Sequence, residues 1–213
     1  MSYLDNFFLW RKKKKESHRT EYVTMTKEQL KERKEEEFNQ YKKLREVIVD
    51  TAKSYIGQEE IRGNMGFKNA WFQKKMVAVG FRKTQPWCAY FAELVYKESY
   101  KKAGLNMFKK LDKLFSASVI KTMYNFEKAG YRLKTIPEPG DLIIWQSGRS
   151  SRGHIGVVIE KSKDNKWLVT VEGNTNKAGG REGIMVAKKT RRNIIRFKRK
   201  GLHIRGYISP IKK

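Results

Sequence analysis

An apolar stripe at helical spacing runs through residues 41 to 55 and marks the first folded element of the chain. Its members recur every three or four positions, as on one face of a helix: Tyr41, Leu44, Ile48, Ala52 and Tyr55. Thr26 and Gln29 have the spacing of a capping box, and Gly57 is a natural helix stop. Lys27 to Lys43 are mostly charged. We predict one long helix whose second half belongs to a domain and whose first half is a solvated or partner-binding extension.

The pattern becomes irregular between residues 57 and 86, where glycine, asparagine and aromatic residues gather without a clear period. A loop region so rich in large apolar side chains is more typical of a groove wall than of a linker. Helical spacing returns at Cys88 and continues to about Lys102, where Gly104 breaks it. A further helical pattern follows from Leu111 to Phe126 and ends at Gly130.

From Ile136 onward the apolar residues take the period of strands. Three strands are predicted at residues 141–145, 154–160 and 167–172, and three less regular ones near 183–188, 193–198 and 203–209. Short turns between strands imply antiparallel pairing. Helices first and strands last predict an α+β domain, with N-terminal helices packed on an antiparallel sheet of about five to six strands. We place this domain at residues 45–213 and the extension at residues 1–44.

Charge separates the two ends of the chain from its middle. The 213 residues carry a formal net charge of +26, with a pI near 10.1. Residues 188 to 213 hold eleven Lys and Arg and no acid, which predicts strands with a basic outer face. Such a face is either a solvated sheet surface or a clamp for a polyanion, an anionic wall polymer or nucleic acid.

The amino-terminal segment resembles a docking device more than an export signal. Residues 3–10 are largely apolar but short, and the cations at residues 11–15 follow them, whereas a secretory signal has its cations first. No apolar run approaches the ~20 residues of a membrane span. We therefore predict no signal peptide and no transmembrane segment, and we assign residues 1–44 to binding a partner protein.

The only cysteine of the chain, Cys88, stands at a position that suits a nucleophile. It follows Pro86 and Trp87 at the start of a predicted helix, where the backbone N–H groups and the helix dipole favour a negatively charged thiolate. A lone cysteine is more often a small buried residue without chemistry. The decision between the two depends on a base and an orienting group elsewhere in the chain.

His154 is the best-placed base, since it opens a predicted strand next to a loop, while His18 and His203 lie in charged stretches. Glu172 and Asn174 lie at the end of the next strand. In an antiparallel pair the start of one strand faces the end of its neighbour, so these residues are expected to meet. A Cys at a helix start facing a His that is oriented by Glu or Asn is the arrangement of a cysteine acyl-transfer enzyme.

Four short motifs in this order resemble the CHAP family of cysteine amidohydrolases and peptidases. They are Pro86-Trp87-Cys88-Ala89-Tyr90-Phe91, Pro139-Gly140-Asp141-Leu142-Ile143, Gly153-His154-Ile155-Gly156-Val157-Val158 and Val171-Glu172-Gly173-Asn174-Thr175. The resemblance covers about residues 45 to 210. It implies a papain-like fold, cleavage of amide bonds in peptidoglycan, Cys88 as nucleophile, His154 as base and Glu172 as orienting acid, with Asn174 assisting.

Other residues are assigned by their place beside these motifs. Gln85 and the Cys88 backbone N–H are candidates for stabilising an oxyanion, and Trp71, Trp87 and Trp145 are candidate walls of a substrate groove. Some members of the family carry an Asp-rich calcium loop ahead of the cysteine. None is found between Gly57 and Pro86, so we predict no metal and no cofactor.

The function that the resemblance implies is that of a peptidoglycan amidase or peptide endopeptidase, which would bind the wall and its anionic polymers. Without a signal peptide, the enzyme would be a phage lysin or a virion component, carried in the virion or the host cytoplasm before it acts at the wall. One alternative is a phage structural or nucleic-acid-contacting protein on a CHAP-like scaffold, in which hydrolysis is secondary or lost. Another is a bacterial amidase exported by a non-classical route.

Overall fold

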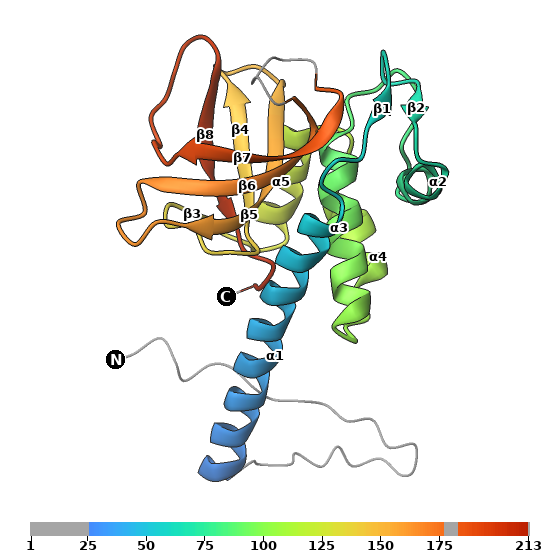
Figure 1. The fold of residues 1–213 in the computed structure, drawn as a ribbon. Helices are drawn as coiled ribbons and strands as arrows, with labels where there is room; N and C mark the ends of the chain where they lie inside the picture. Colours follow the sequence, from blue (N-terminus) through green and yellow to red (C-terminus); the bar gives the residue numbers. More distant parts are fainter. Residues whose placement is uncertain (1–25, 177–182, 213) are drawn as a thin grey trace. The chain divides into compact units, whose positions relative to one another are not determined.

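The computed structural model describes residues 26–176 and 183–212 and divides the chain into two units after Asn39. The predicted tail at residues 1–25 lies outside the described residues. The smaller unit contributes the start of helix α1 (Lys27–Ser54), and the larger unit contains every other element (Figure 1). In the described part of the chain no helix is long and apolar enough to cross a membrane.

Helix α1 begins and is buried as its sequence pattern predicts. Thr26 and Gln29 form the capping box, because each side chain accepts a hydrogen bond from the backbone N–H of the other, at 3.0 and 3.2 Å. Buried α1 residues occur only in its second half: Leu44, Ile48, Thr51 and Ala52. Residues 31 to 40 are exposed throughout, and the exposed fraction of Phe38 is 68%. The stripe thus belongs to the larger unit.

Four further helices follow α1: α2 (Ala70–Ala78), α3 (Cys88–Lys102), α4 (Phe108–Leu114) and α5 (Val119–Lys128). Helix α3 has the bounds that the sequence predicts. The expectation of an irregular segment from 57 to 86 is wrong in part, because α2 lies within it and is capped by the Asn69 side chain. A small hairpin of β1 (Glu60–Ile61) and β2 (Gly66–Phe67) precedes it.

The main sheet has six antiparallel strands in the order β3-β8-β4-β5-β6-β7. Their bounds are β3 (Leu133–Lys134), β4 (Leu142–Ser147), β5 (Gly153–Lys161), β6 (Trp167–Thr175), β7 (Met185–Arg192) and β8 (Leu202–Ile208). The α+β class and the strand number are confirmed. The strand predicted at 193–198 is wrong: the chain leaves the sheet after Arg192, where the Asn193 side chain bonds to the Asn165 carbonyl and the Tyr207 hydroxyl.

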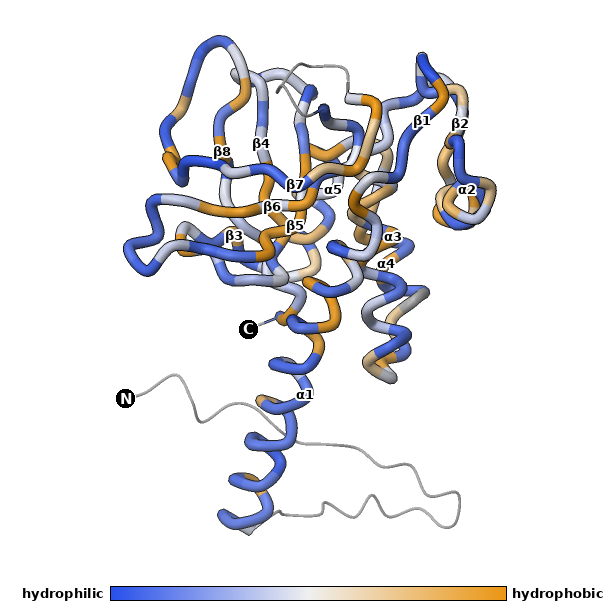
Figure 2. Tube along the Cα trace, viewed as in Figure 1, coloured by the Kyte–Doolittle hydropathy of each residue, from blue (hydrophilic) through white to orange (hydrophobic). Residues whose placement is uncertain are grey.

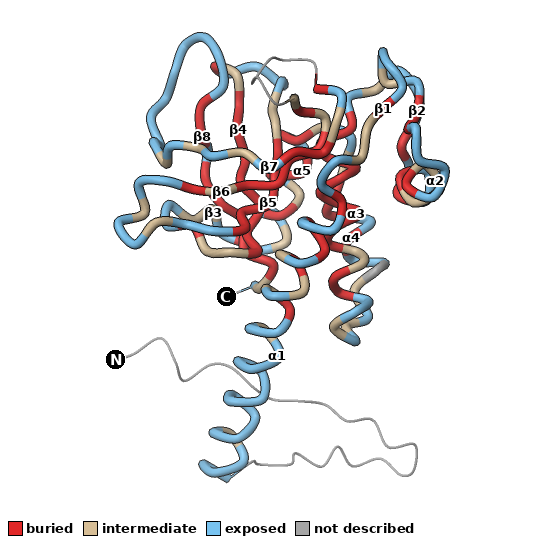
Figure 3. Tube along the Cα trace, in the orientation of Figure 1, coloured by how far each residue is buried: buried red, intermediate tan, exposed pale blue. Residues whose placement is uncertain are grey.

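The sheet buries apolar residues on both faces. The larger core joins the helices to one face and includes Phe91, Met123 and Val157. A smaller cluster lies on the other face and includes Ile143, Trp145 and Tyr207. Hydrophobic and buried positions follow the central strands and α3, while the turns and the start of α1 are polar and exposed (Figures 2 and 3). Burial of both faces makes the central strands a rigid support for side chains at their ends.

A buried ion cluster ties α1 to the start of β4. Asp141 has no exposed surface, and its carboxylate bonds to Arg45 and to Lys134, both at 2.9 Å. Burial raises the pKa of Asp141, against the opposing effect of the two cations. Gly140 has a φ of +87°, and a β-carbon there would lie 3.1 Å from the Arg45 Cα. The Pro-Gly-Asp motif is therefore a structural junction between helix and sheet.

Candidate active site

Cys88 is the first residue of α3 and is almost fully buried, with an exposed fraction of 5%. The first hydrogen bond within this helix runs from the Phe91 N–H to the Trp87 carbonyl, and the Trp87 side chain makes no cap. The N–H groups of the first turn are therefore not used inside the helix. They direct a positive potential at the thiol.

Two glycines permit the close packing of the site. A β-carbon at Gly173 would lie 2.6 Å from the Phe91 Cβ, so the absent side chain lets α3 approach β6. A β-carbon at Gly156 would lie 2.7 Å from the Glu172 Cγ. The Gly156 position therefore leaves the space in which Glu172 crosses β5 toward His154. Gly156 and Gly173 thus let the strands, the helix and the Glu172 side chain pack closely at the site.

His154 lies between Cys88 and Glu172. Its Nε2 donates to Glu172 Oε2 at 2.9 Å, and Cys88 is the other side chain that acts on the charge of the imidazole. Burial lowers the pKa of His154, but the bonds to Cys88 and Glu172 outweigh it and raise the pKa to about 10. The imidazole is therefore held as the cation, the state that pairs with a thiolate.

Glu172 has no exposed surface, and its two carboxylate oxygens accept from three side chains. Besides His154, Thr170 donates to Oε1 at 2.6 Å, and Arg191 donates to Oε1 at 2.8 Å and to Oε2 at 2.5 Å. Burial opposes ionisation, but the bonds to His154 and Arg191 prevail and lower the pKa of Glu172 to about 2. The buried carboxylate is therefore charged at neutral pH.

Trp145 covers the imidazole from one side. Its ring centroid is 5.4 Å from that of His154, and the two planes are inclined by 33°. Trp145 faces His154 directly in the β4–β5 register, which explains the contact. The guanidinium carbon of Arg191 lies 5.6 Å from the same indole. The exposed fraction of Trp145 is only 7%. Because its indole lies against the imidazole, it shields the His154–Glu172 pair from water.

Asn174 lies on the nucleophile's side of the site and has a φ of +52°. Its side-chain amide, oriented so that both ends find partners, donates to the Gly183 carbonyl at 2.7 Å and accepts from the Trp87 backbone N–H at 3.3 Å. This geometry supports a role in fixing the chain just before Cys88. Assistance to His154 stays a prediction.

Comparison with families of known proteins is consistent with this geometry. Residues 80–174 match the model of the CHAP domain. The middle of the chain is therefore similar to a CHAP domain. Comparisons with curated proteins and with solved structures give no significant match. CHAP domains are generally hydrolases of cell-wall peptides, and peptidoglycan is the substrate that the family implies.

The match includes the helix and the two strands that carry the site. It covers Cys88, His154, Glu172 and Asn174, but it ends before Arg191. Sequence reasoning missed Arg191 as a site residue, since it had assigned this arginine only to a basic outer face. The sequence nevertheless held an indication of this role, because a buried carboxylate beside a histidine is stable only with a cation near it, and Arg191 is one of the cations on the adjacent strand.

The sequence predicts that three further residues stabilise the oxyanion or line a substrate groove: Gln85, Trp87 and Trp71. Gln85 accepts a hydrogen bond from the Tyr90 hydroxyl at 2.6 Å, which fixes its side-chain carbonyl. Trp87 has no exposed surface and donates its indole N–H to Glu60 at 2.5 Å, so it lies in the core and lines no groove. Trp71 is 54% exposed and stacks on Tyr55.

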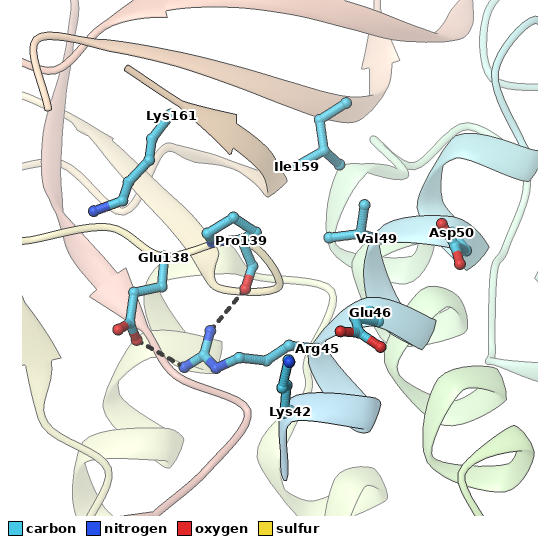
Figure 4. A pocket seen from close by; sticks show the side chains of 9 residues that line it. All are labelled: Lys42, Arg45, Glu46, Val49, Asp50, Glu138, Pro139, Ile159 and Lys161. Carbon is cyan, nitrogen blue, oxygen red and sulfur yellow. Dashed lines mark hydrogen bonds and ion pairs between the residues drawn. The ribbon is translucent and has the colours of Figure 1, made fainter. Parts of the chain in front are cut away.

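A pocket of about 610 Å³ lies elsewhere, at the end of β5 opposite to His154. Figure 4 shows Arg45 donating to the Pro139 carbonyl and pairing with Glu138, with Lys42 and Lys161 among the other lining side chains. It holds no cysteine or histidine, so the hydrolase chemistry lies elsewhere. Among the described residues, no group of three or more His, Cys, Asp and Glu is placed to hold a metal ion.

Proposed function

We propose that this protein hydrolyses an amide bond of peptidoglycan by a Cys-His-Glu mechanism, with Cys88 as nucleophile, His154 as general base and acid, and Glu172 as the orienting acid. The observation that carries the proposal is the position of His154, which bonds to Glu172 at 2.9 Å and whose pKa is raised by its interaction with Cys88. A nucleophile, a base and an orienting group in hydrogen-bond reach are the minimum that covalent acyl transfer requires.

The acylation half of the reaction follows from this arrangement. The Cys88 thiolate attacks the carbonyl carbon, a C–S bond forms, and the electron pair of the C=O bond moves to oxygen. When the tetrahedral intermediate collapses, the C–N bond breaks and His154 gives its proton to the departing nitrogen. An amine leaves and a thioester remains on Cys88.

In the deacylation half, His154 is neutral and accepts a proton from water. The water oxygen attacks the thioester carbon and the C–S bond breaks, which releases a carboxylic acid and regenerates the Cys88 thiolate beside protonated His154. The acid then gives its proton to the solvent. Glu172 keeps the Nε2–H bond throughout, so Nδ1 remains the nitrogen that gives and takes the proton.

The oxyanion is assigned to the start of α3. The Cys88 N–H belongs to the helix turn whose donors are not used within the helix, and Gln85 lies three residues before it. Preorganised donors of this kind stabilise the charge that develops on oxygen in the transition state. The Tyr90 hydroxyl orients the Gln85 amide, which supports the assignment.

Muramoyl–alanine amidase and peptide endopeptidase remain the two forms of this activity, because both attack amides with the same groups. Incubation of wild-type protein with purified peptidoglycan, followed by identification of the new chain ends, separates them. We expect soluble fragments with either free N-terminal L-alanine or new amino groups within the stem peptide. Release of reducing sugar ends without new amino groups would contradict the proposal.

We also propose that the loop joining β7 and β8, residues 193–201, binds anionic wall polymers. Its cations Arg196, Lys198, Arg199 and Lys200 are exposed, and no acid lies between residues 188 and 213. The loop follows Arg191 and Arg192 directly, so bound polymer would lie beside the site. Charge alone also fits nonspecific contact with nucleic acid, which was the other polyanion expected.

The extension at residues 1–44 is proposed to dock on a partner protein. Its described part, the start of α1, is exposed and mostly charged, with Phe38 as an exposed apolar side chain. A virion component or a lysin would account for such a segment in a wall hydrolase, and so would a structural virion protein. Genes for a holin, or for tail or capsid proteins, beside this gene would distinguish these origins from a bacterial amidase.

A further inference from the structure

Arg191 holds the carboxylate that orients the base. Its Nε donates to Glu172 Oε1 at 2.8 Å and its Nη2 donates to Oε2 at 2.5 Å, a two-point grip on a side chain with no exposed surface. Guanidinium and carboxylate pair in this way with both distance and orientation fixed. Oε2 is the same oxygen that accepts from His154 Nε2. Arg191 and His154 are thus joined through one atom.

A second link between Arg191 and His154 runs through Trp145. The Arg191 guanidinium lies over the Trp145 indole, and the other neighbour of that indole in the site is the His154 ring, at 5.4 Å between centroids. Arg191 therefore touches two of the side chains beside the imidazole, the Glu172 carboxylate at its edge and the Trp145 indole beside its face. Arg192, the next residue, lies over Trp167, 5.3 Å from that ring, and provides a comparison on the same strand.

The burial of the pair is unequal. The Arg191 side chain is 31% exposed and Glu172 is at 0%, so the arginine lies between the carboxylate and solvent. A buried carboxylate without a cation is costly and tends to take up a proton. The hydrogen bond from Arg191 contributes to the low pKa of Glu172.

We propose that Arg191 is a positioning residue of the hydrolase, which holds Glu172 charged and aimed at His154 and keeps Trp145 against the imidazole. The inference rests on the proposed function for its catalytic consequence. It extends the site beyond the segment that matches the CHAP model, to the end of β7. The Leu168–Arg191 register between β6 and β7 brings it there.

The test compares Arg191→Ala and Arg191→Lys with the control Arg192→Ala, using soluble peptidoglycan fragments as substrate. For Arg191→Ala we expect kcat to fall on the order of 10- to 100-fold with KM within about threefold of wild type, because a bond to a charged group is lost beside the base. Arg191→Lys keeps the charge without the two-point grip and should fall in between. Arg192→Ala should stay within about twofold.

Two readouts separate positioning from simple destabilisation. Because Arg191 is partly exposed, guanidinium added at about 50 mM should restore part of the kcat of Arg191→Ala, and sodium chloride at the same ionic strength should not. The NMR titration of His154 should shift in Arg191→Ala, because the carboxylate that binds Nε2 loses its second cation, and it should stay in place in Arg192→Ala. This titration needs no substrate, so it tests the inference even where wild type fails to hydrolyse peptidoglycan.

An unchanged kcat in Arg191→Ala, or an unchanged His154 titration, overturns the inference. If Arg191→Ala does not fold, Arg191→Lys decides: wild-type kcat and a wild-type His154 titration overturn it, and a reduced kcat with a shifted titration supports it. If wild type does not hydrolyse peptidoglycan but the His154 titration is shifted in Arg191→Ala, the proposed function is overturned and the positioning role of Arg191 stands.

Discussion

Gly173 on β6 packs directly against Phe91 on α3, since a β-carbon at position 173 would lie only 2.6 Å from the Phe91 Cβ. This contact sets how closely the helix that carries Cys88 approaches the strand that carries Glu172. The distance between nucleophile and acid thus depends on a residue that has no side chain of its own.

Gly173→Ala should force α3 away from β6. We expect a loss of about 1–3 kcal/mol in the free energy of unfolding, together with reduced specific activity of the folded protein. Gly201→Ala is the control, because position 201 has open space and a φ of +77°, so it carries only backbone strain of about 1 kcal/mol. Urea unfolding measures the stability of each variant, and wall hydrolysis measures its specific activity. Equal specific activity in the two variants would contradict the packing argument.

Glu172→Gln keeps the shape of the side chain and removes its charge. We expect kcat to fall about 100-fold or more, because the imidazolium loses its buried counterion and Nε2–H its fixed acceptor. Thr170→Val removes only the hydroxyl that donates to Oε1 at 2.6 Å, and it should cost no more than about tenfold. Steady-state kinetics on soluble fragments compare them. A larger loss in Thr170→Val than in Glu172→Gln would contradict the assignment of Glu172.

The charge state of His154 predicts a pH dependence of stability. Its pKa is raised from 6.5 to about 10, so its contribution is complete below 6.5 and is lost as pH rises toward 10. The pKa of Glu172 is lowered from 4.5 to about 2, so its contribution is complete above 4.5 and is lost as pH falls toward 2. Both are complete between pH 4.5 and 6.5.

The stability difference between wild type and His154→Gln should therefore be largest in that window and shrink on either side. Urea unfolding at a series of pH values measures it. In Cys88→Ala the NMR titration of His154 should move to lower pH, because the bond to Cys88 is the largest effect that raises the pKa. A His154 titration near 6.5 in wild type would contradict the ion pair.

The basic loop at 193–201 predicts a salt-dependent affinity for walls that carry anionic polymers. Changing Arg196, Lys198, Arg199 and Lys200 to glutamine should weaken sedimentation with such walls and reduce its dependence on salt. Four exposed lysines on the helices, changed together, give a control with the same loss of charge: Lys109, Lys113, Lys121 and Lys128. If both sets weaken binding equally, total charge decides the binding, and the loop has no special part.

Much of the site could be predicted from the sequence, because its parts are local. Pro86 and the apolar spacing after Cys88 define the start of α3, and the short turn at residues 163–166 pairs the start of β5 with the end of β6. These two features bring Cys88, His154 and Glu172 toward one place. The resemblance to the CHAP family added the roles.

Arg191 could not be placed in this way. Its contact with Glu172 depends on the register of β6 with β7, which is shifted by an irregularity between Glu172 and Thr175. The alternation of apolar and polar residues along β7 does not tell which residue of β6 each one faces when such an irregularity lies between the turn and that residue. The false strand at 193–198 has a related cause, since Ile194, Ile195 and Phe197 are half exposed although their residue types favour strands.

The most direct test of the account is the hydrolysis of purified peptidoglycan by wild type and by Cys88→Ala at equal concentration. Alanine at this buried position removes only the thiol, so the variant should keep its fold and its melting temperature to within a few degrees. The account predicts release of new amino groups by wild type and none above background by Cys88→Ala. Release by the folded variant at more than about a tenth of the wild-type rate would contradict Cys88 as the nucleophile.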